Sequence, residues 1–256
     1  MYRTLQKPEP QGKLDLQERD ILWIRAANRF RFFTTDQAQL MSGTPGRKKM
    51  NKRLAQLWAH DFLGRPELQY AFSRDAKRPT IHALGQKGAA WLEKNDGVKF
   101  PKGKGWKTAN DLKDPSNLSH QISLVDVMLK GDREFQEIPD VWMTHQDQLI
   151  AQVDWPKGLR KHWLPTQVMK DGKLVDRKTN PDNTALLSQK LPSGDVGHVV
   201  NYIEQDMATE DFIVTNTLAA SIAQKHISYA DAYRRKLTKQ LYGYSSMRVL
   251  WVVKGR

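Results

Sequence analysis

Residues 47–64, RKKMNKRLAQLWAHDFLG, are the stretch that decides the fold of the amino-terminal part of the chain. Met50, Leu54, Leu57 and Phe62 recur at near-helical spacing and predict a helix with one buried apolar stripe. Basic residues fill the first two turns of this helix: Arg47, Lys48, Lys49, Lys52 and Arg53. Cations oppose the dipole at a helix N-terminus, so an anion outside the protein would relieve the mismatch. The pattern is typical of a recognition helix that presents its N-terminal residues to the major groove of DNA.

The residues before this stretch predict two further helices. An apolar pattern of helical period begins after Leu14. A short helix then fits between a cap at Thr34 or Thr35 and a stop at Gly43. Together with the basic helix, these elements predict a helix-turn-helix.

The residues after the stretch predict a β-hairpin. Two extended runs, residues 66–72 and 78–84, flank a polar connection and precede a closing helix. Three bases at the hairpin tip, Arg74, Lys77 and Arg78, are expected to contact the phosphate backbone beside the groove. The whole pattern therefore predicts a winged helix-turn-helix.

Positive charge is concentrated in the same half of the chain. Residues 1–110 hold 22 Lys and Arg against 10 Asp and Glu, whereas the remaining residues hold 19 against 18. Such asymmetry indicates a nucleic-acid-binding half attached to a second domain. A basic surface that serves solubility or binds anionic lipid is the alternative interpretation.

Composition excludes several classes of protein. The chain has no cysteine, so disulfides and thiolate metal sites are excluded. No run of about 18 apolar residues and no hydrophobic leader are present, so we expect a cytoplasmic protein without membrane partners. The sequence also lacks a glycine-rich phosphate loop and a GxSxG motif, and therefore gives no support for nucleotide hydrolysis or serine esterase chemistry.

The pattern along the chain predicts an α+β or α/β protein of two domains. A mixed sheet covered by helices is expected in the second, because strand patterns alternate there with a helical stretch near 229–244. The predicted division is an arm at 1–13, a winged-helix domain at 14–95, a linker at 96–116 and the mixed domain at 117–256.

Carboxylates gather on two predicted strands of the second domain. Asp182 opens one strand, while Glu204 and Asp206 lie two apart on the next and share a face. Three such groups could bind Mg²⁺, which would activate water for attack on a phosphate. The other interpretation is a solvated face, or carboxylates paired with nearby arginines.

Most of the chain resembles the plasmid replication-relaxation family. The resemblance rests on the winged-helix pattern and on the segments SHQISLVDVML, the Pro-Asp strand, YIEQDMATE, RRKLTKQLYGY and VLWVV. It implies a DNA-binding protein of a plasmid or other mobile element that acts in replication, mobilisation or transcriptional control. Double-stranded DNA is the expected partner, and a second copy of the chain and replication or relaxase proteins are further candidates.

The second domain is also similar in outline to the PD-(D/E)xK, or restriction-endonuclease-like, fold. That likeness implies Asp182 and Glu204 as metal ligands and a Mg²⁺-dependent DNA endonuclease as the alternative function. Asp206 stands where such enzymes carry a lysine, which leaves either an acidic variant or a dead site. Lys236 or Lys239 could take the role of that lysine, and Glu134 or Glu137 could add a ligand. An inactive nuclease-like fold used for dimerisation or protein contacts is favoured over an active nuclease. DNA binding itself requires no cofactor.

Overall fold

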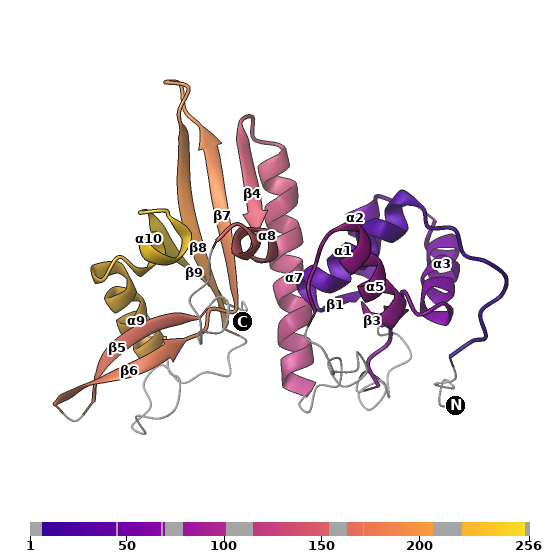
Figure 1. Cartoon of the computed structure of the whole chain (residues 1–256), viewed down its shortest axis with the longest axis horizontal. Helices are drawn as coiled ribbons and strands as arrows, with labels where there is room; N and C mark the ends of the chain where they lie inside the picture. The colour runs from indigo at the N-terminus through magenta and orange to yellow at the C-terminus, as the bar shows by residue number, and fades with distance from the viewer. Residues whose placement is uncertain are drawn as a thin grey trace. The chain divides into compact units, whose positions relative to one another are not determined.

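The computed structural model describes residues 7–44, 46–67, 69, 79–100, 115–153, 163–170, 172–206 and 222–253. The chain has a mixed α+β fold, which confirms the expected fold class at this level. It forms two compact units, Met1–Leu129 and Lys130–Arg256, which are drawn in Figure 1. Residues 101–114, most of the expected linker, lie outside the described residues.

In the first unit, helices surround a small antiparallel sheet (Figure 1). The elements follow in this order: α1 (Glu18–Phe30), β1 (Phe32–Thr34), α2 (Thr35–Ser42), α3 (Arg47–Ala59), β2 (Leu63–Gly64), β3 (Ile81–Leu84) and α5 (Gln86–Asn95). The strand order is β1-β3-β2, with both pairs antiparallel. Part of the run predicted at 78–84 is β3, but its partner β2 lies before the run predicted at 66–72.

Local signals at the start and end of α2 are those that the sequence indicates. The Thr34 side chain accepts a hydrogen bond from the backbone N–H of Gln37, and the Gln37 side chain accepts one from the N–H of Thr34. Gly43 follows the helix with φ 59°, a left-handed conformation that favours glycine. The predicted caps of this short helix are therefore confirmed.

Helix α3 begins at Arg47 as predicted but ends at Ala59, before the expected Gly64. Asp61 turns the chain with φ 65°, and the N–H groups of Asp61 and Phe62 donate to the carbonyls of Trp58 and Leu57. This pair of hydrogen bonds is a Schellman closure, here with aspartate at the position where glycine is usual. Phe62 therefore lies in the turn, and its predicted place in the helical stripe is wrong.

The core of the first unit forms where α1, α3 and the sheet meet. Trp23, Phe32 and Met50 are fully buried, and Leu54 and Leu57 complete the predicted stripe of α3. Burial of each such side chain contributes about 1.5–3 kcal/mol. The stripe fixes the face of α3 that turns inward.

Helix α7 (Pro115–Gln136) contributes its residues up to Leu129 to the first unit. Leu118 and Ile122 pack with Phe32 and Ala83 of the small sheet. The Gln37 side-chain amide donates to the backbone carbonyl of Ile122 at 2.8 Å. The division between the units consequently lies within α7, whereas the sequence pattern places it in the preceding linker.

The second unit is built on a four-stranded mixed sheet with the order β4-β7-β8-β9. Its elements are β4 (Val141–His145), α8 (Gln146–Ala151), β5 (Leu164–Lys170), β6 (Lys173–Thr179), β7 (Asn183–Lys190), β8 (Val196–Asp206), α9 (Ile222–Arg234), α10 (Leu237–Tyr242) and β9 (Met247–Val253). Strands β4, β7 and β8 pair antiparallel, while β8 and β9 are parallel. Strands β5 and β6 form a separate hairpin beside α9 (Figure 1).

The sequence VWMTHQDQLIAQV, residues 141–153, predicts an extended run, but only part of it is a strand. Strand β4 ends at His145, and α8 starts immediately after it. The backbone N–H of His145 donates to the Gln148 side chain at 3.2 Å, a local bond that satisfies this helix start.

Helices α9 and α10 cover the face of the sheet that Tyr202 occupies. The Tyr202 ring is fully buried and stacks on Tyr229 of α9 with centroids 5.5 Å apart. Its hydroxyl lies 3.0 Å from the hydroxyl of Thr238 in α10. The crossover helices are thus fixed on the sheet, which positions every side chain that α9 turns toward β8.

Candidate functional site

The solvent-facing side of α3 carries lysines. Lys48, Lys49 and Lys52 are exposed, whereas Met50 and Leu54 of the same helix are buried. With the other described residues, none of these three lysines forms an ion pair. The face therefore presents uncompensated positive charge, which is what a polyanion would contact.

The two arginines predicted for the same face have different environments. Arg47 is exposed and pairs with Asp36 of α2 at 2.8 Å. Arg53 is largely buried, and its guanidinium pairs with the fully buried carboxylate of Asp20 and donates to the carbonyl of Asp15. The Asp20 carboxylate also accepts from the backbone N–H of Gln17 at the start of α1. Arg53 consequently ties α3 to α1 and directs its charge into the protein.

The predicted hairpin bases Arg74, Lys77 and Arg78 lie outside the described residues. The strands that bound this segment are paired antiparallel, with Leu63 opposite Leu84.

The second unit brings the predicted carboxylates Asp182 and Glu204 together. Asn183 pairs with Ile203 in the β7–β8 ladder, so Asp182, one residue earlier, comes opposite Glu204. The Asp182 carboxylate accepts a hydrogen bond from the backbone N–H of Gln205 at 2.8 Å. The predicted proximity of these two carboxylates is therefore present.

Two side chains of α9, which the sequence analysis missed, hold the Glu204 carboxylate. Lys225 donates to Oε2 at 2.9 Å, and the Tyr229 hydroxyl donates to Oε1. The two residues lie four positions apart, a spacing that puts them on one helix face. This i, i+4 signal was hidden because residues before Tyr229 were not recognised as helical.

Different features of the environment of Glu204 shift the pKa of its carboxyl group in opposite directions. Burial raises the pKa of Glu204, and the negative charge of Asp182 raises it further, while Tyr229 and Lys225 oppose both effects. Burial and the neighbouring Glu204 also raise the pKa of Tyr229. The tyrosine hydroxyl therefore stays protonated and donates to the carboxylate.

The other predicted members of the site lie at the end of β8, around the start of α10 and near the end of α7. Asp206 is half-buried at the end of β8, opposite Val253 of β9. Lys236 is exposed at the residue before α10, and Lys239 is exposed within that helix. Glu134 and Glu137 are also exposed.

These residues do not fit a magnesium site. Both oxygens of Glu204 already accept hydrogen bonds from Lys225 and Tyr229, whereas Mg²⁺ needs about six oxygen ligands in octahedral geometry. Across the part of the chain that is described, no group of three or more His, Asp and Glu side chains is gathered as metal ligands are. The arrangement instead fixes α9 on the sheet.

The fold and the two clusters define a two-unit α+β protein with a lysine-bearing helix in one unit and a buried carboxylate–lysine–tyrosine contact in the other. The sequence model of the replication-relaxation family matches residues 24–245, and the chain belongs to this family. That membership suggests a role in the replication of a plasmid or other mobile element. The chain matches no curated protein and no solved structure. None of the described helices has the length and apolar content to cross a bilayer.

Proposed function

We propose that the chain is a double-stranded DNA-binding protein that acts in the replication of a plasmid or other mobile element. The observation that carries the proposal is the set Lys48, Lys49 and Lys52 on α3, which is exposed and forms no ion pair with the described part of the chain. Each lysine that neutralises a DNA phosphate releases a condensed counterion, which supplies most of the affinity of such proteins. The stripe of α3 opposite these lysines is buried. Only the lysine-bearing side of the helix can therefore enter a groove of the DNA.

A winged helix-turn-helix is the DNA-binding form that we propose for the first unit. The order of helix, strand, two helices and two strands supports it, as does the short connection from Gly43 to Gly46 between α2 and α3. In a helix-turn-helix the second of the two helices, here α3, enters the major groove. In this proposal Arg74, Lys77 and Arg78 contact phosphates from the wing, and Arg47 contributes from the start of α3.

Arg53 has a positioning role in this proposal. Its guanidinium is paired with Asp20, so it holds α3 against α1 and does not reach into the groove. The three exposed lysines of α3 remain as the groove-facing cations. Replication or relaxase proteins and a second copy of the chain are candidate partners of the complex.

The test is the salt dependence of duplex binding by the full chain. We expect the variant Lys48→Gln, Lys49→Gln, Lys52→Gln to bind duplex DNA more weakly. The slope of log affinity against log salt should become shallower by about 0.9 for each phosphate that the variant no longer neutralises. Glutamine preserves helix propensity, so the fold of α3 should be unchanged.

A matched control removes the same charge elsewhere. Lys173, Lys178 and Lys190 are exposed in the second unit, and their change to glutamine should leave the slope for duplex DNA unaltered. If both triple variants shift the slope equally, binding reflects total charge alone and the assignment to α3 is wrong.

The endonuclease interpretation, the alternative function, has its own test. Supercoiled plasmid is incubated with the chain and Mg²⁺ or Mn²⁺, and the Glu204→Gln variant is compared with the unchanged chain. Because the Glu204 oxygens are engaged by Lys225 and Tyr229, we expect no metal-dependent nicking from either protein. Nicking that the substitution abolishes would establish a nuclease site at Glu204.

A further inference from the structure

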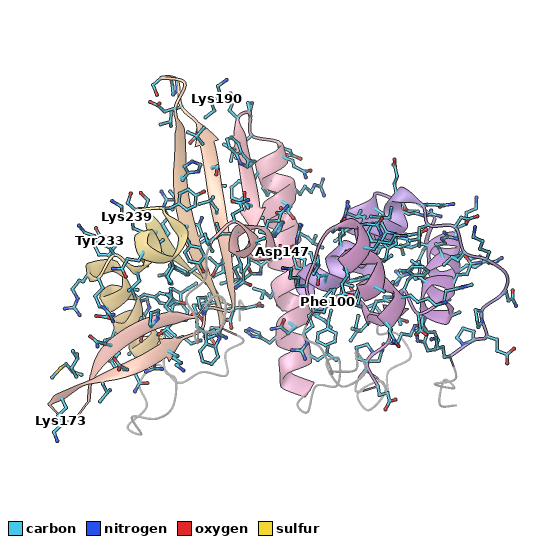
Figure 2. All side chains as sticks on the ribbon, viewed as in Figure 1. Phe100, Asp147, Lys173, Lys190, Tyr233 and Lys239 are labelled. Carbon is cyan, nitrogen blue, oxygen red and sulfur yellow. The ribbon has the colours of Figure 1, made fainter. Side chains whose placement is uncertain are left out.

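The joint between α9 and α10 carries a second cluster of cations, in the second unit. Arg234, Lys236 and Lys239 line an open pocket of about 280 Å³ together with Tyr233 and Ser245. Figure 2 shows Tyr233 and Lys239 near each other at the outer surface of these helices. Three cations line this open depression, which suits it to an anion that extends beyond the depression itself.

The backbone at this joint explains why the side chains point outward. Helix α9 ends at Arg234, and Lys236 adopts φ 55° before α10 begins. Leu237 and Thr238 turn inward and are buried, whereas Tyr233, Arg234, Lys236 and Lys239 remain exposed. A non-glycine residue with positive φ is uncommon, and the packing of Leu237 and Thr238 holds it in place.

The acidic residue beside this cluster, Asp231, forms only a long ion pair with one of its three cations. The Asp231 carboxylate is buried and accepts from the backbone N–H of Gln167 at 2.7 Å and from Arg235 at 3.3 Å. Its nearest approach to Arg234 is 3.9 Å, at the limit of an ion pair. Asp231 therefore serves to fix the β5–β6 hairpin on α9, and Lys236 and Lys239 form no ion pair with the other described residues.

We propose that the α9–α10 cluster, defined as Tyr233, Arg234, Lys236 and Lys239, binds single-stranded DNA. Its three cations can neutralise phosphates of a nucleic-acid backbone, a contact that does not require exact spacing. The Tyr233 side chain is 67% exposed, which is unusual for so large an aromatic group. An exposed ring beside cations is the combination that stacks an unpaired base while its phosphates are neutralised.

The tyrosine favours a single strand over a duplex as the occupant. Bases in a duplex are stacked on each other, so their faces are not available to a side chain at the surface. This site lies in a different unit from α3, and it goes beyond the duplex-binding role proposed for that helix.

The experiment measures binding of the full chain to a fluorescein-labelled oligothymidylate of about 20 nucleotides, long enough for one site. We expect Tyr233→Ala to weaken binding about 5- to 150-fold, as loss of one stacked base would, and Tyr233→Phe to bind as the unchanged chain does. The variant Arg234→Gln, Lys236→Gln, Lys239→Gln should reduce the salt slope by about 0.7 for each phosphate left without a cation.

The controls separate this proposal from the role of α3. The Lys173, Lys178 and Lys190 glutamine variant should bind the oligonucleotide normally, and so should the Lys48, Lys49 and Lys52 glutamine variant. A Tyr233→Ala variant that binds as tightly as the unchanged chain would overturn the proposal, and so would a cation variant no weaker than the control. In either case duplex binding through α3 would still stand or fall on its own test.

Discussion

At the scale of single residues, the pair of Arg53 and Asp20 shows that a cation in a basic helix can be structural. Breaking a buried ion pair leaves the remaining charge without compensation, at a cost of about 3–5 kcal/mol. We expect Arg53→Met to lower the free energy of unfolding by about this amount. Lys52→Met, a change at the exposed neighbour, should stay within about 0.5 kcal/mol of the unchanged chain. Urea unfolding followed by tryptophan fluorescence measures both.

The same two variants separate stability from DNA contact. If Arg53→Met were as stable as Lys52→Met but had a shallower salt slope on duplex DNA, Arg53 would belong to the DNA-contacting set.

His82 makes the first unit sensitive to acid. The ring is fully buried on Phe33 and close to the Thr35 hydroxyl, and burial lowers the pKa of His82 to about 3, with a further contribution from Arg65. Above pH 6.5 the ring is neutral in both the folded and the unfolded chain. Between pH 6.5 and about 3 only the unfolded chain binds the proton, so the free energy of unfolding falls as the pH falls.

The size of this effect is set by one proton. The slope reaches about 1.4 kcal/mol for each pH unit, and His82→Phe should remove it while keeping the stack on Phe33. The measurement is urea unfolding of both proteins between about pH 7 and pH 4. If the free energy of unfolding of both proteins changed with pH in parallel, His82 would not have the lowered pKa that its burial implies.

Within the site, the sequence could predict which side chains of α3 are exposed. The stripe of Met50, Leu54 and Leu57 fixes which side of α3 is inward, and the exposure of Lys48 and Lys52 follows from helical geometry. The contacts of Glu204 with Lys225 and Tyr229 could not be found in this way. They join residues 21 and 25 positions apart, and no local period reports such a pairing.

At the scale of elements, the backbone that follows α3 is hydrogen-bonded to the first turn of α5. The carbonyl of Asp61 accepts from the N–H of Lys87 at 2.9 Å, and so supplies a partner that no side chain provides at the start of α5. A Cβ at Gly85 would lie 2.2 Å from that carbonyl oxygen. Glycine is therefore required at position 85 by close approach of two backbones.

Substitution of this glycine tests the joint. We expect Gly85→Ala to destabilise the first unit, because backbone atoms must shift to admit the methyl group. Gly131→Ala in α7 is the matched control, since its nearest neighbour would be the Met143 side chain at 3.6 Å, an ordinary contact. Alanine within a helix gains about 0.5–1 kcal/mol over glycine, so that variant should be neutral or more stable. Thermal unfolding that ranks the two variants in the opposite order would contradict this account.

Element boundaries were predictable where local chemistry sets them. Thr34 and Gly43 bound α2 as their residue types indicate, but α3 stops early because Asp61 takes a left-handed conformation that aspartate rarely signals. Strand β1 is three residues long and has too little period to be recognised. Its pairing with β3 depends on a contact across about 50 positions, which only the folded chain defines.

At the scale of the whole molecule, the family membership suggests a biological role, whereas the excess of positive charge indicates in which half the cations are concentrated. Residues 1–110 account for nearly all of the net charge of +13, yet the α9–α10 cluster lies in the nearly neutral part. Net charge of a half therefore locates a strong anion-binding surface but conceals a small one, because acids elsewhere in the same half cancel its count. Asp231, turned inward, is one such acid.

If α3 binds duplex and the α9–α10 cluster binds a single strand, the full chain should prefer DNA that offers both. A duplex with a single-stranded tail of about 20 nucleotides turns the second contact into an intramolecular one at millimolar effective concentration. We expect this substrate to bind at least about tenfold more tightly than the duplex or the oligonucleotide alone. The measurement is competition among the three DNAs at one salt concentration.

Variants show whether both surfaces produce this preference. The Lys48, Lys49, Lys52 glutamine variant should bind the tailed duplex no better than the single strand, and Tyr233→Ala should bind it no better than the duplex. A tailed duplex that binds the unchanged chain only as tightly as the better of its parts would show that the two surfaces do not engage one DNA together. Tight binding that survives both variants would place the DNA contacts on other residues, because disabling either surface abolishes the multivalent gain.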